Sequence, residues 1–383
     1  MKPKILLFAG GYLPAKTYGG PVISISNIIE SLGDLYNFRV IAVNHEKNDT
    51  KPLDGIKEGW NRVGKADVLY VPYRKISYSS VFNTIKVEDP DMIYLNSLFC
   101  TKWVLPTLLF ARKHKTGVLI APRGQLLENA IRRKRLKKIP YIFLMRLLFN
   151  NKNIYWQSTC EEETLSIKKW FGVSDERILR LDNLPRTIQW QDKKEKKQGH
   201  LKLVFISRIH PIKNLHIAIQ AAQKLGGNVE FDIYGPVEDK VYWQKCEDLI
   251  KNSPPNVKIT YRGILDYSDV PEVLSRYHAF ILPSETENYG HAIVEALLSG
   301  IVVIISNNTP WSSAKDYRAG YVIDGKNIQG YAEALNEVLQ MDNKEYDDMV
   351  ERSIEYIKKE INLEQLVQKY INAFNSIINA VRR

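Results

Sequence analysis

The chain has 383 residues, of which 44% are hydrophobic and 25% charged, a balance that excludes a disordered or low-complexity protein. This length exceeds what one hydrophobic core usually serves, so we expect two domains. The net charge of +11 favours an anionic partner, such as a phosphorylated small molecule, an anionic lipid or a nucleic acid.

The cysteines and the beginning of the chain predict a cytoplasmic protein. Cys100, Cys160 and Cys246 lie far apart, with neither the paired spacing of a zinc site nor the density of a disulfide scaffold. The apolar run at 5–9 is too short for a signal peptide and ends in a glycine turn. No window approaches the ~20 apolar residues of a membrane-spanning helix, so we expect at most a protein that lies on a membrane surface.

Apolar runs of strand length alternate with segments of helical period through the first half of the chain. Strands that are apolar throughout are typical of a parallel sheet covered by helices on both faces. We therefore predict a Rossmann-like domain over residues 1–190. Its expected strands lie at 5–9, 38–43, 68–71, 92–95 and 117–121, and its expected helices include 22–32 and 103–113.

The segment 191–200 is polar and charged throughout, so we place the domain linker there. A second Rossmann-like domain is predicted over residues 200–360, followed by a C-terminal helix at 361–383 that packs back toward the first domain. The expected strands of the second domain lie at 203–206, 230–234, 257–261, 279–282, 302–305 and 320–323, with helices at 214–225, 239–251, 289–298, 327–340 and 344–359. Open sheets bind ligands at the carboxyl ends of their strands, so two such domains predict a site in the cleft between them.

The segment 282–300 carries the strongest functional pattern of the chain. Glu287 and Glu295 are separated by seven residues and stand on either side of Gly290, which precedes a predicted helix. A turn that carries one carboxylate and a helix that carries the other can direct both toward one ligand. The backbone N–H groups of Tyr289, Gly290 and His291 suit a phosphate at the beginning of that helix. The alternative is an amphipathic surface helix with two solvated glutamates.

This segment resembles the donor-site motif of the family-four retaining glycosyltransferases of the GT-B superfamily, also described as glycosyl transferases group 1. The resemblance implies a fold of two doubly wound domains facing across a cleft. It also implies that Glu295 binds the ribose of a nucleotide sugar and that Glu287 contacts the transferred sugar. The second domain would then bind the donor and the first domain the acceptor.

A second pattern follows the first strand of the predicted donor domain. Arg208 ends that strand and Lys213 stands five residues later at the start of a helix, which puts two cations where a diphosphate would lie. By resemblance they stabilise the charge that builds on the departing nucleotide, so that no metal and no cofactor is needed. The alternative is that both are ordinary charges at the ends of a strand and a helix.

Shorter glycine-containing turns complete the predicted donor site. Gly19 and Gly20 close the loop after the first strand of the chain, where a glycine-rich backbone can bind phosphate or simply turn. Gly235, Ile264 and Leu265 follow successive strands and match the places where the family holds the nucleotide base. Each of these segments is equally explained as a turn.

The first domain offers two features for the acceptor or a membrane. Arg123 stands where related sequences often carry a histidine, and it either binds an acceptor phosphate or caps a loop. The segment 130–149 begins with the cations Arg132, Arg133, Lys134 and Arg135 and has an apolar, aromatic second half. This composition suits contact with anionic lipid, although a core helix with a solvated basic face explains it too. Pro140 is expected to kink or divide this segment.

Together these features predict a retaining hexosyltransferase that uses a UDP- or GDP-linked sugar. Its expected acceptor is a lipid-linked oligosaccharide of surface polysaccharide synthesis, such as O-antigen, lipopolysaccharide or capsule, at the inner face of the cytoplasmic membrane. A nucleotide-sugar epimerase or a phosphorylase on the same fold is an alternative. A basic nucleic-acid-binding protein is another, although no nucleic-acid-binding motif is recognised.

Overall fold

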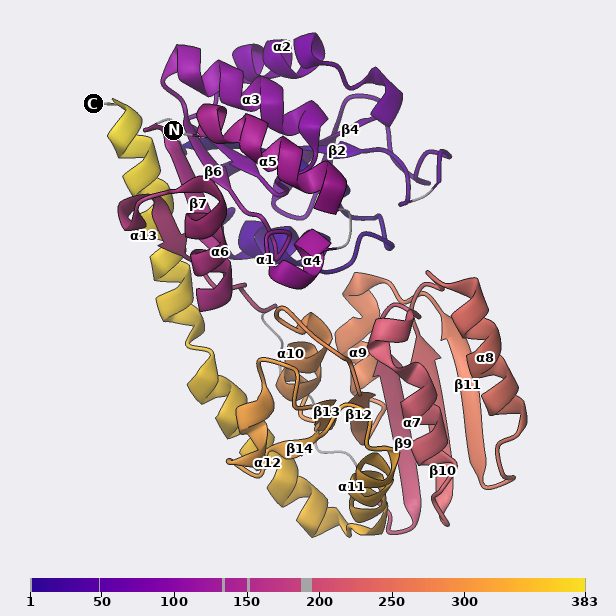
Figure 1. The fold of residues 1–383 in the computed structure, drawn as a ribbon. Helices are drawn as coiled ribbons and strands as arrows, with labels where there is room; N and C mark the ends of the chain where they lie inside the picture. The colour runs from indigo at the N-terminus through magenta and orange to yellow at the C-terminus, as the bar shows by residue number, and fades with distance from the viewer. Residues whose placement is uncertain (1, 48, 133–134, 150–151, 187–194, 383) are drawn as a thin grey trace. The chain divides into compact units, whose positions relative to one another are not determined.

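The fold is described from a computed structural model that covers residues 2–47, 49–132, 135–149, 152–186 and 195–382. The chain forms two compact units, Met1–Leu184 with Leu363–Arg383 and Pro185–Asn362 (Figure 1). Each unit has hydrophobic cores of its own. Both are doubly wound α/β structures, as the alternation of strands and helices predicts.

The first unit is built on an eight-stranded sheet with the order β3-β4-β2-β1-β5-β6-β7-β8. Its strands run in parallel except for β3, which pairs with β4 in antiparallel register. The strand order reverses between β1 and β5, so the carboxyl ends of these two strands mark its ligand-binding edge. The strands are β1 Lys4–Ala9, β2 Asn37–Val43, β3 Trp60–Val63, β4 Ala66–Val71, β5 Met92–Leu95, β6 Gly117–Ile120, β7 Ile154–Ser158 and β8 Ile178–Arg180.

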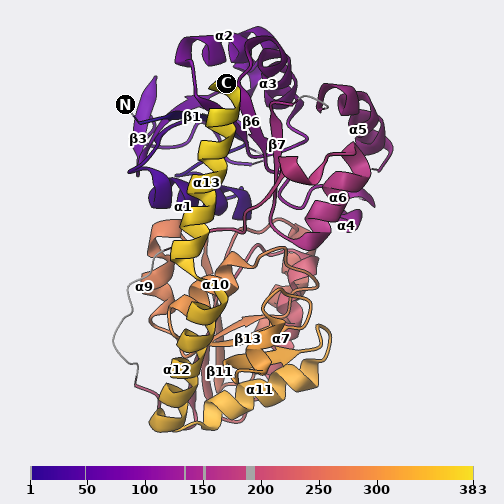
Figure 2. The same ribbon diagram turned by 90° about the vertical axis from the view of Figure 1, so that its left-hand side faces the viewer.

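Helices cover both faces of this sheet, and a separate core lies on each face. The core on one face includes α2, α3, α5 and α6, and the core on the other includes α1 and α13. Helix α13 lies along the sheet in contact with β6 (Figure 2), although it begins 243 residues after that strand ends. The helices are α1 Gly20–Leu32, η1 Tyr73–Lys75, α2 Tyr78–Glu88, α3 Thr101–His114, α4 Glu128–Arg132, α5 Arg135–Phe149, α6 Glu161–Phe171, η2 Asp175–Arg177 and α13 Leu363–Arg382.

Three strands of the first unit, β3, β7 and β8, are absent from the sequence prediction. The edge strand β3 has only four residues, and it adds one antiparallel pairing to the predicted parallel sheet. Pro140, expected to kink or divide its segment, lies within the continuous helix α5. It is exposed, and Ile142 and Met145, which follow it in the same helix, are buried.

The second unit is built on a six-stranded parallel sheet with the order β11-β10-β9-β12-β13-β14. The order reverses between β9 and β12, which makes the carboxyl ends of these strands the expected ligand-binding edge. The elements are β9 His200–Ile206, η3 Pro211–Lys213, α7 Leu215–Ala222, β10 Asn228–Tyr234, α8 Lys240–Lys251, β11 Val257–Gly263, η4 Tyr267–Asp269, α9 Val270–Leu274, β12 Ala279–Leu282, α10 His291–Leu298, β13 Val302–Ser306, η5 Ser312–Lys315, β14 Gly320–Ile323, α11 Ile328–Gln340 and α12 Asn343–Glu360.

The described part of the segment predicted as a linker, 195–200, belongs to the second unit. The Nζ of Lys196 donates to the carbonyl oxygens of Leu339 and Met341 at 3.1 and 3.2 Å, and so satisfies carbonyls at the end of α11. Burial lowers the pKa of Lys196 to about 8. Lys196, which lies in the segment predicted as a linker, is therefore a buried residue of the second unit.

Candidate donor site

The site is assembled by three loops that follow neighbouring strands of the second sheet. The backbone N–H of Glu285, after β12, donates to the carbonyl of Ile212, after β9, at 2.8 Å. The Ser306 hydroxyl, at the end of β13, donates to the carbonyl of Ser284 at 2.6 Å. The Glu287 N–H donates to the carbonyl of Asn308 at 3.3 Å. These bonds fix the loops after β9, β12 and β13 against one another at the edge where the strand order reverses.

Lys213 and Glu287 meet in this loop cluster. The Nζ of Lys213 lies 2.5 Å from Oε1 of Glu287, and their side chains are 9% and 12% exposed. A charge-assisted bond with so little solvent around it is stronger than a surface ion pair. The structure therefore brings together one predicted cation and one predicted carboxylate at a place where both are largely shielded from solvent.

Arg208, predicted to bind the diphosphate, forms an ion pair with a glutamate of the same unit. Its Nη1 lies 2.5 Å from Oε2 of Glu238, in the loop after β10. That loop passes close to the end of β9 because Gly235 has φ of 140°, and a Cβ there would lie 1.9 Å from the carbonyl oxygen of Ser207. Glycine is thus required at 235 for the approach that places Glu238 beside Arg208.

Glu295 lies on the buried face of α10. The residue is 5% exposed, and its Oε1 has no hydrogen-bond partner among the described residues. Burial raises the pKa of the Glu295 carboxyl from 4.5 to about 7, while the positive charge of Arg186 and a hydrogen bond with the Tyr267 side chain oppose the rise. An unsatisfied buried carboxylate oxygen is costly, so it marks a place where a ligand hydroxyl would gain a strong acceptor.

The residues around the beginning of α10 form a rigid turn. Gly290 caps the helix with φ of 76°, a conformation that favours glycine. The Nε1 of Trp311 donates to the carbonyl of Tyr289 at 2.5 Å, and the Tyr289 ring packs edge-on against His291 at a centroid distance of 4.7 Å. These contacts hold the N-terminus of α10, which the sequence predicts as a phosphate site, in one orientation.

Ile264 and Leu265 follow β11 and lead into the short helix η4. Ile264 is 43% exposed, whereas Leu265 packs partly against the core. The Gly235 N–H donates to the carbonyl of Gly263 at 2.8 Å, which joins this turn to the one after β10. These predicted base-binding positions therefore adjoin the η4 helix that carries Tyr267.

In the first unit, Gly19 and Gly20 lie at the beginning of α1, where Gly19 has φ of 69°. Arg123 is held by three neutral acceptors within the same unit. Its Nε donates to Oδ1 of Asn96 at 2.8 Å, its Nη1 to Oδ1 of Asn183 at 2.7 Å, and its Nη2 to the Tyr94 hydroxyl at 2.7 Å. The guanidinium therefore links the ends of β5 and β6 to the chain that leaves β8.

The basic segment spans α4 and α5. Arg132 is exposed and pairs with Glu128 at 2.7 Å, and Arg135 is exposed at the beginning of α5. Arg133 and Lys134 lie outside the described residues. Leu136 and Phe143 on α5 are 91% and 78% exposed, a degree of exposure unusual for large apolar side chains.

Arg186, Tyr267 and Glu238 belong to none of the functional patterns of the sequence. Arg186 follows a proline near the predicted linker, and Tyr267 lies in an unpatterned loop between β11 and α9. The one signal that points to Glu238 is its place in the loop after β10, next to the glycine turn at Gly235. Their role is visible only in the partners that they contact.

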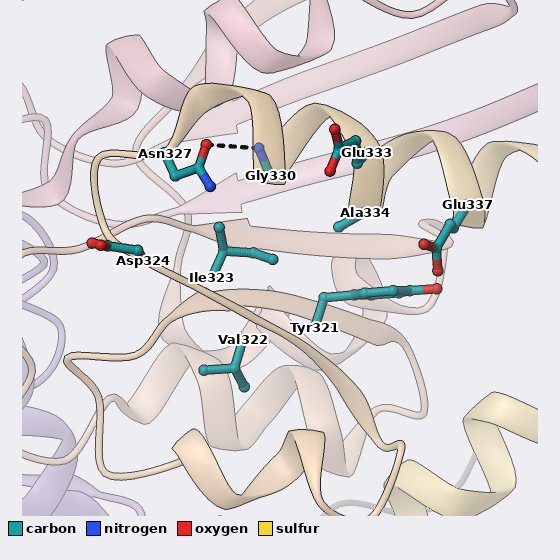
Figure 3. A pocket seen from close by; sticks show the side chains of 9 residues that line it. All are labelled: Tyr321, Val322, Ile323, Asp324, Asn327, Gly330, Glu333, Ala334 and Glu337. Carbon is teal, nitrogen blue, oxygen red and sulfur yellow. Dashed lines mark hydrogen bonds between the residues drawn. The ribbon is translucent and has the colours of Figure 1, made fainter.

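A pocket of about 340 Å³ lies elsewhere in the second unit, between β14 and α11 (Figure 3). Its lining includes Tyr321, Glu333 and Glu337, and none of the predicted site residues. In the portion of the chain that the structure describes, no three His, Cys, Asp or Glu side chains are grouped as metal ligands. Among the helices of the same portion, none has both the length and the apolarity to cross a bilayer.

Comparison with known proteins finds a family match for most of the second unit. Residues 187–358 match the family described as Glycosyl transferases group 1. The chain is 27% identical over 146 residues to O-antigen chain mannosyltransferase B of Escherichia coli, and 24% identical over 149 residues to 2-deoxystreptamine N-acetyl-D-glucosaminyltransferase of Niallia circulans. These matches span 37% and 38% of this chain and the same shares of the two relatives.

Solved structures share the fold over nearly the whole chain. Sucrose-phosphate synthase from Thermosynechococcus elongatus covers 99% of this chain and is itself covered completely, with a TM-score of 0.72 and 13% identity. Anabaena HepE in complex with UDP-glucose gives a TM-score of 0.70, 14% identity, and coverage of 97% of this chain and 99% of its own. WaaG, a glycosyltransferase involved in lipopolysaccharide biosynthesis, gives 0.69, 15%, and coverage of 97% and 99%. Residues 187–358 thus match the Glycosyl transferases group 1 family, and the chain as a whole has the GT-B fold of these structures.

Proposed function

We propose that this protein transfers a sugar from a nucleoside-diphosphate sugar to an acceptor hydroxyl, with retention of the anomeric configuration. The observation that carries the proposal is the arrangement at the reversal point of the second sheet: a shielded Lys213–Glu287 pair, and on α10 a buried Glu295 with an unpartnered oxygen. Hydroxyl-rich ligands need carboxylate acceptors, and a diphosphate needs cations and helix N–H groups.

Each of these residues binds a different part of the donor. Glu295 accepts hydrogen bonds from the ribose hydroxyls, and Glu287 accepts one from the transferred sugar. Lys213 and Arg208 exchange part of their present ion pairs for the diphosphate oxygens. The positive charges then stabilise the departing nucleotide without a metal.

The reaction breaks the bond between the anomeric carbon and the phosphate oxygen. The acceptor hydroxyl forms the new glycosidic bond on the same face, and its proton passes to the departing phosphate oxygen. Because the acceptor attacks on the face from which the phosphate departs, the product keeps the configuration of the donor, and no covalent sugar–enzyme intermediate is needed. Retention is part of the proposal and rests on the resemblance of the donor motif.

We further propose a lipid-linked acceptor in surface polysaccharide synthesis, at the cytoplasmic face of the membrane. The names of the O-antigen mannosyltransferase and of the lipopolysaccharide enzyme WaaG support this choice. So do the exposed apolar side chains of α5, which stand in a basic segment. UDP- and GDP-sugars are the first donors to test, because a structural neighbour was solved with UDP-glucose.

A thermal-shift screen against UDP-, GDP- and ADP-sugars tests the donor assignment. A cognate donor at 100 times its dissociation constant stabilises the wild-type protein by about 2.7 kcal/mol. Glu295→Ala is expected to abolish this shift, whereas Arg132→Ala, an exposed change outside the donor unit, leaves it unchanged. Equal shifts in the wild type and the Glu295 variant would count against the assignment.

Transfer is then measured with the donor that binds, with and without a polyprenyl-diphosphate-linked acceptor. Acceptor-dependent release of the nucleoside diphosphate supports transfer, and the rate should be unchanged by EDTA. Interconversion of the donor sugar without acceptor would instead indicate an epimerase. Salt-sensitive binding to nucleic acid with no nucleotide-sugar affinity would reject the proposal.

A further inference from the structure

Arg186 contacts both the ring and the main chain of Tyr267, in the second unit. Its guanidinium carbon lies 3.7 Å from the centroid of the Tyr267 ring. Its Nη2 donates to the main-chain carbonyl of Tyr267 at 2.6 Å, and its Nη1 to that of Ser268 at 3.5 Å. The arginine thus holds both the ring and the backbone at the beginning of η4, a geometry that a planar guanidinium can adopt and an ammonium cannot.

Tyr267 in turn contacts the buried carboxyl of Glu295. The Tyr267 side chain is hydrogen-bonded to Glu295, while Oε1 of Glu295 has no partner among the described residues. Helix α10 packs against α9, α12, β12 and β13. The ionisable groups that act on the Glu295 carboxyl are nevertheless Arg186 and Tyr267, which come from the segment before β9 and from η4.

A carboxylate at 5% exposure has lost nearly all its hydration and tends to take up a proton. A protonated carboxyl gives up acceptor capacity and becomes a donor at one oxygen. Arg186 opposes this protonation through its charge. Two of its five N–H donors bond to the carbonyls of Ser268 and Tyr267, and Oε1 of Glu295 has no partner among the described residues, so this oxygen remains open for a ligand.

We propose that Arg186 is a positioning residue for donor binding: it fixes Tyr267 and keeps the Glu295 carboxylate charged, oriented and open to the nucleotide's ribose. This inference rests on the proposed function, in which Glu295 binds that ribose. Arg186 itself does not touch the donor. Its loss should therefore weaken nucleotide binding most where Glu295 is most easily protonated.

The test is calorimetric titration of the full-length protein with UDP, GDP and ADP at pH values from 6.5 to 9. The nucleotide that binds the wild type is then used with Arg186→Met, which keeps an unbranched apolar stem but removes the charge. Affinity is expected to fall about tenfold at pH 7 and to approach the wild-type value at pH 9, because an opposite charge nearby shifts a carboxyl pKa by about one unit or more.

Two further variants separate positioning from folding. Tyr267→Phe keeps the ring but removes the hydroxyl, so it should shift the pH profile in the same direction by less. Arg276→Met removes another arginine of this unit, which pairs with Glu272 on the surface, and should match the wild type at every pH. Thermal unfolding without ligand checks that all variants are folded.

The outcomes are distinguishable. A loss of affinity for Arg186→Met that is the same factor at every pH, or no loss at all, overturns the positioning role. If the wild type binds none of the three nucleotides, the proposed function falls and this inference falls with it. If the wild type binds, Glu295→Gln fails to bind at any pH and Arg186→Met follows the wild-type profile, only the inference fails.

Discussion

Burial of the Glu295 carboxylate reduces the stability of the ligand-free protein at neutral and alkaline pH. Its folded-state pKa of about 7 exceeds the ordinary value of 4.5, so the folded protein holds a proton that the unfolded chain releases between these values. Stability contributed by this group is present at low pH, is lost as the pH rises through that window, and stays lost above about 7. A shift of this size corresponds to a loss of about 3 kcal/mol of stability above pH 7.

Glu295→Gln should therefore stabilise the ligand-free protein at pH 8, because the neutral amide avoids a buried negative charge. At pH 5, where the wild-type carboxyl is protonated, the two proteins should unfold at nearly the same temperature. Differential scanning calorimetry at both values measures the difference. A variant that is less stable than the wild type at pH 8 would contradict the buried-charge explanation.

At the scale of the element, α5 presents two different faces. Ile142, Met145 and Phe149 are buried in the core, whereas Leu136, Phe143 and Leu144 are 91%, 78% and 69% exposed. Phe143 and Leu144 follow Leu136 by seven and eight residues, a spacing of about two helical turns that places all three on one side of the helix. Since the segment is also basic, this side fits a surface of anionic lipid.

Replacing Leu136 and Phe143 together by glutamate should weaken binding to vesicles of phosphatidylglycerol and phosphatidylcholine by more than about tenfold. Each change removes an apolar group worth about 1 to 3 kcal/mol and adds repulsion. Vesicle co-sedimentation measures the loss. The matched control is Leu165→Glu on α6, which is 56% exposed and lies in the same unit. An equal loss in the control would show that α5 has no special role.

At the scale of the whole molecule, each unit has its own core, and the last helix belongs to the first unit. Phe374 of α13 is fully buried and packs edge-on against Tyr36 and Tyr94, at centroid distances of 5.5 and 6.3 Å. A 20-residue helix that completes a core formed by the first half of the chain closes the fold of that unit.

Phe374→Ala should destabilise the first unit by about 3 to 5 kcal/mol while leaving the nucleotide-dependent stabilisation of the second unit in place. Calorimetry with and without the nucleotide should show one transition lowered and the other still raised by ligand. Gln368→Ala, an exposed change on the same helix, serves as control. One common transition, lowered as a whole, would indicate that the two units unfold as a single body.

The sequence by itself determined the elements and the motifs that are local. The alternation of apolar strands with helices predicts two doubly wound units, because buried parallel strands must be apolar along their whole length. Lys213, Glu287 and Glu295 could be found as candidates because each stands in a short contiguous pattern after a predicted strand. Strand β3 was missed because an edge strand needs few apolar residues.

The tertiary structure decided which side chains meet. Arg208 pairs with Glu238 because β10 lies next to β9 in the sheet, and the charge of Arg186, 109 residues earlier in the chain, acts on the buried Glu295 carboxyl. Arg123 is likewise fixed by Asn96 and Asn183. Such partners come from chain segments brought together by strand order and burial, and a single sequence read along its length carries no record of that order.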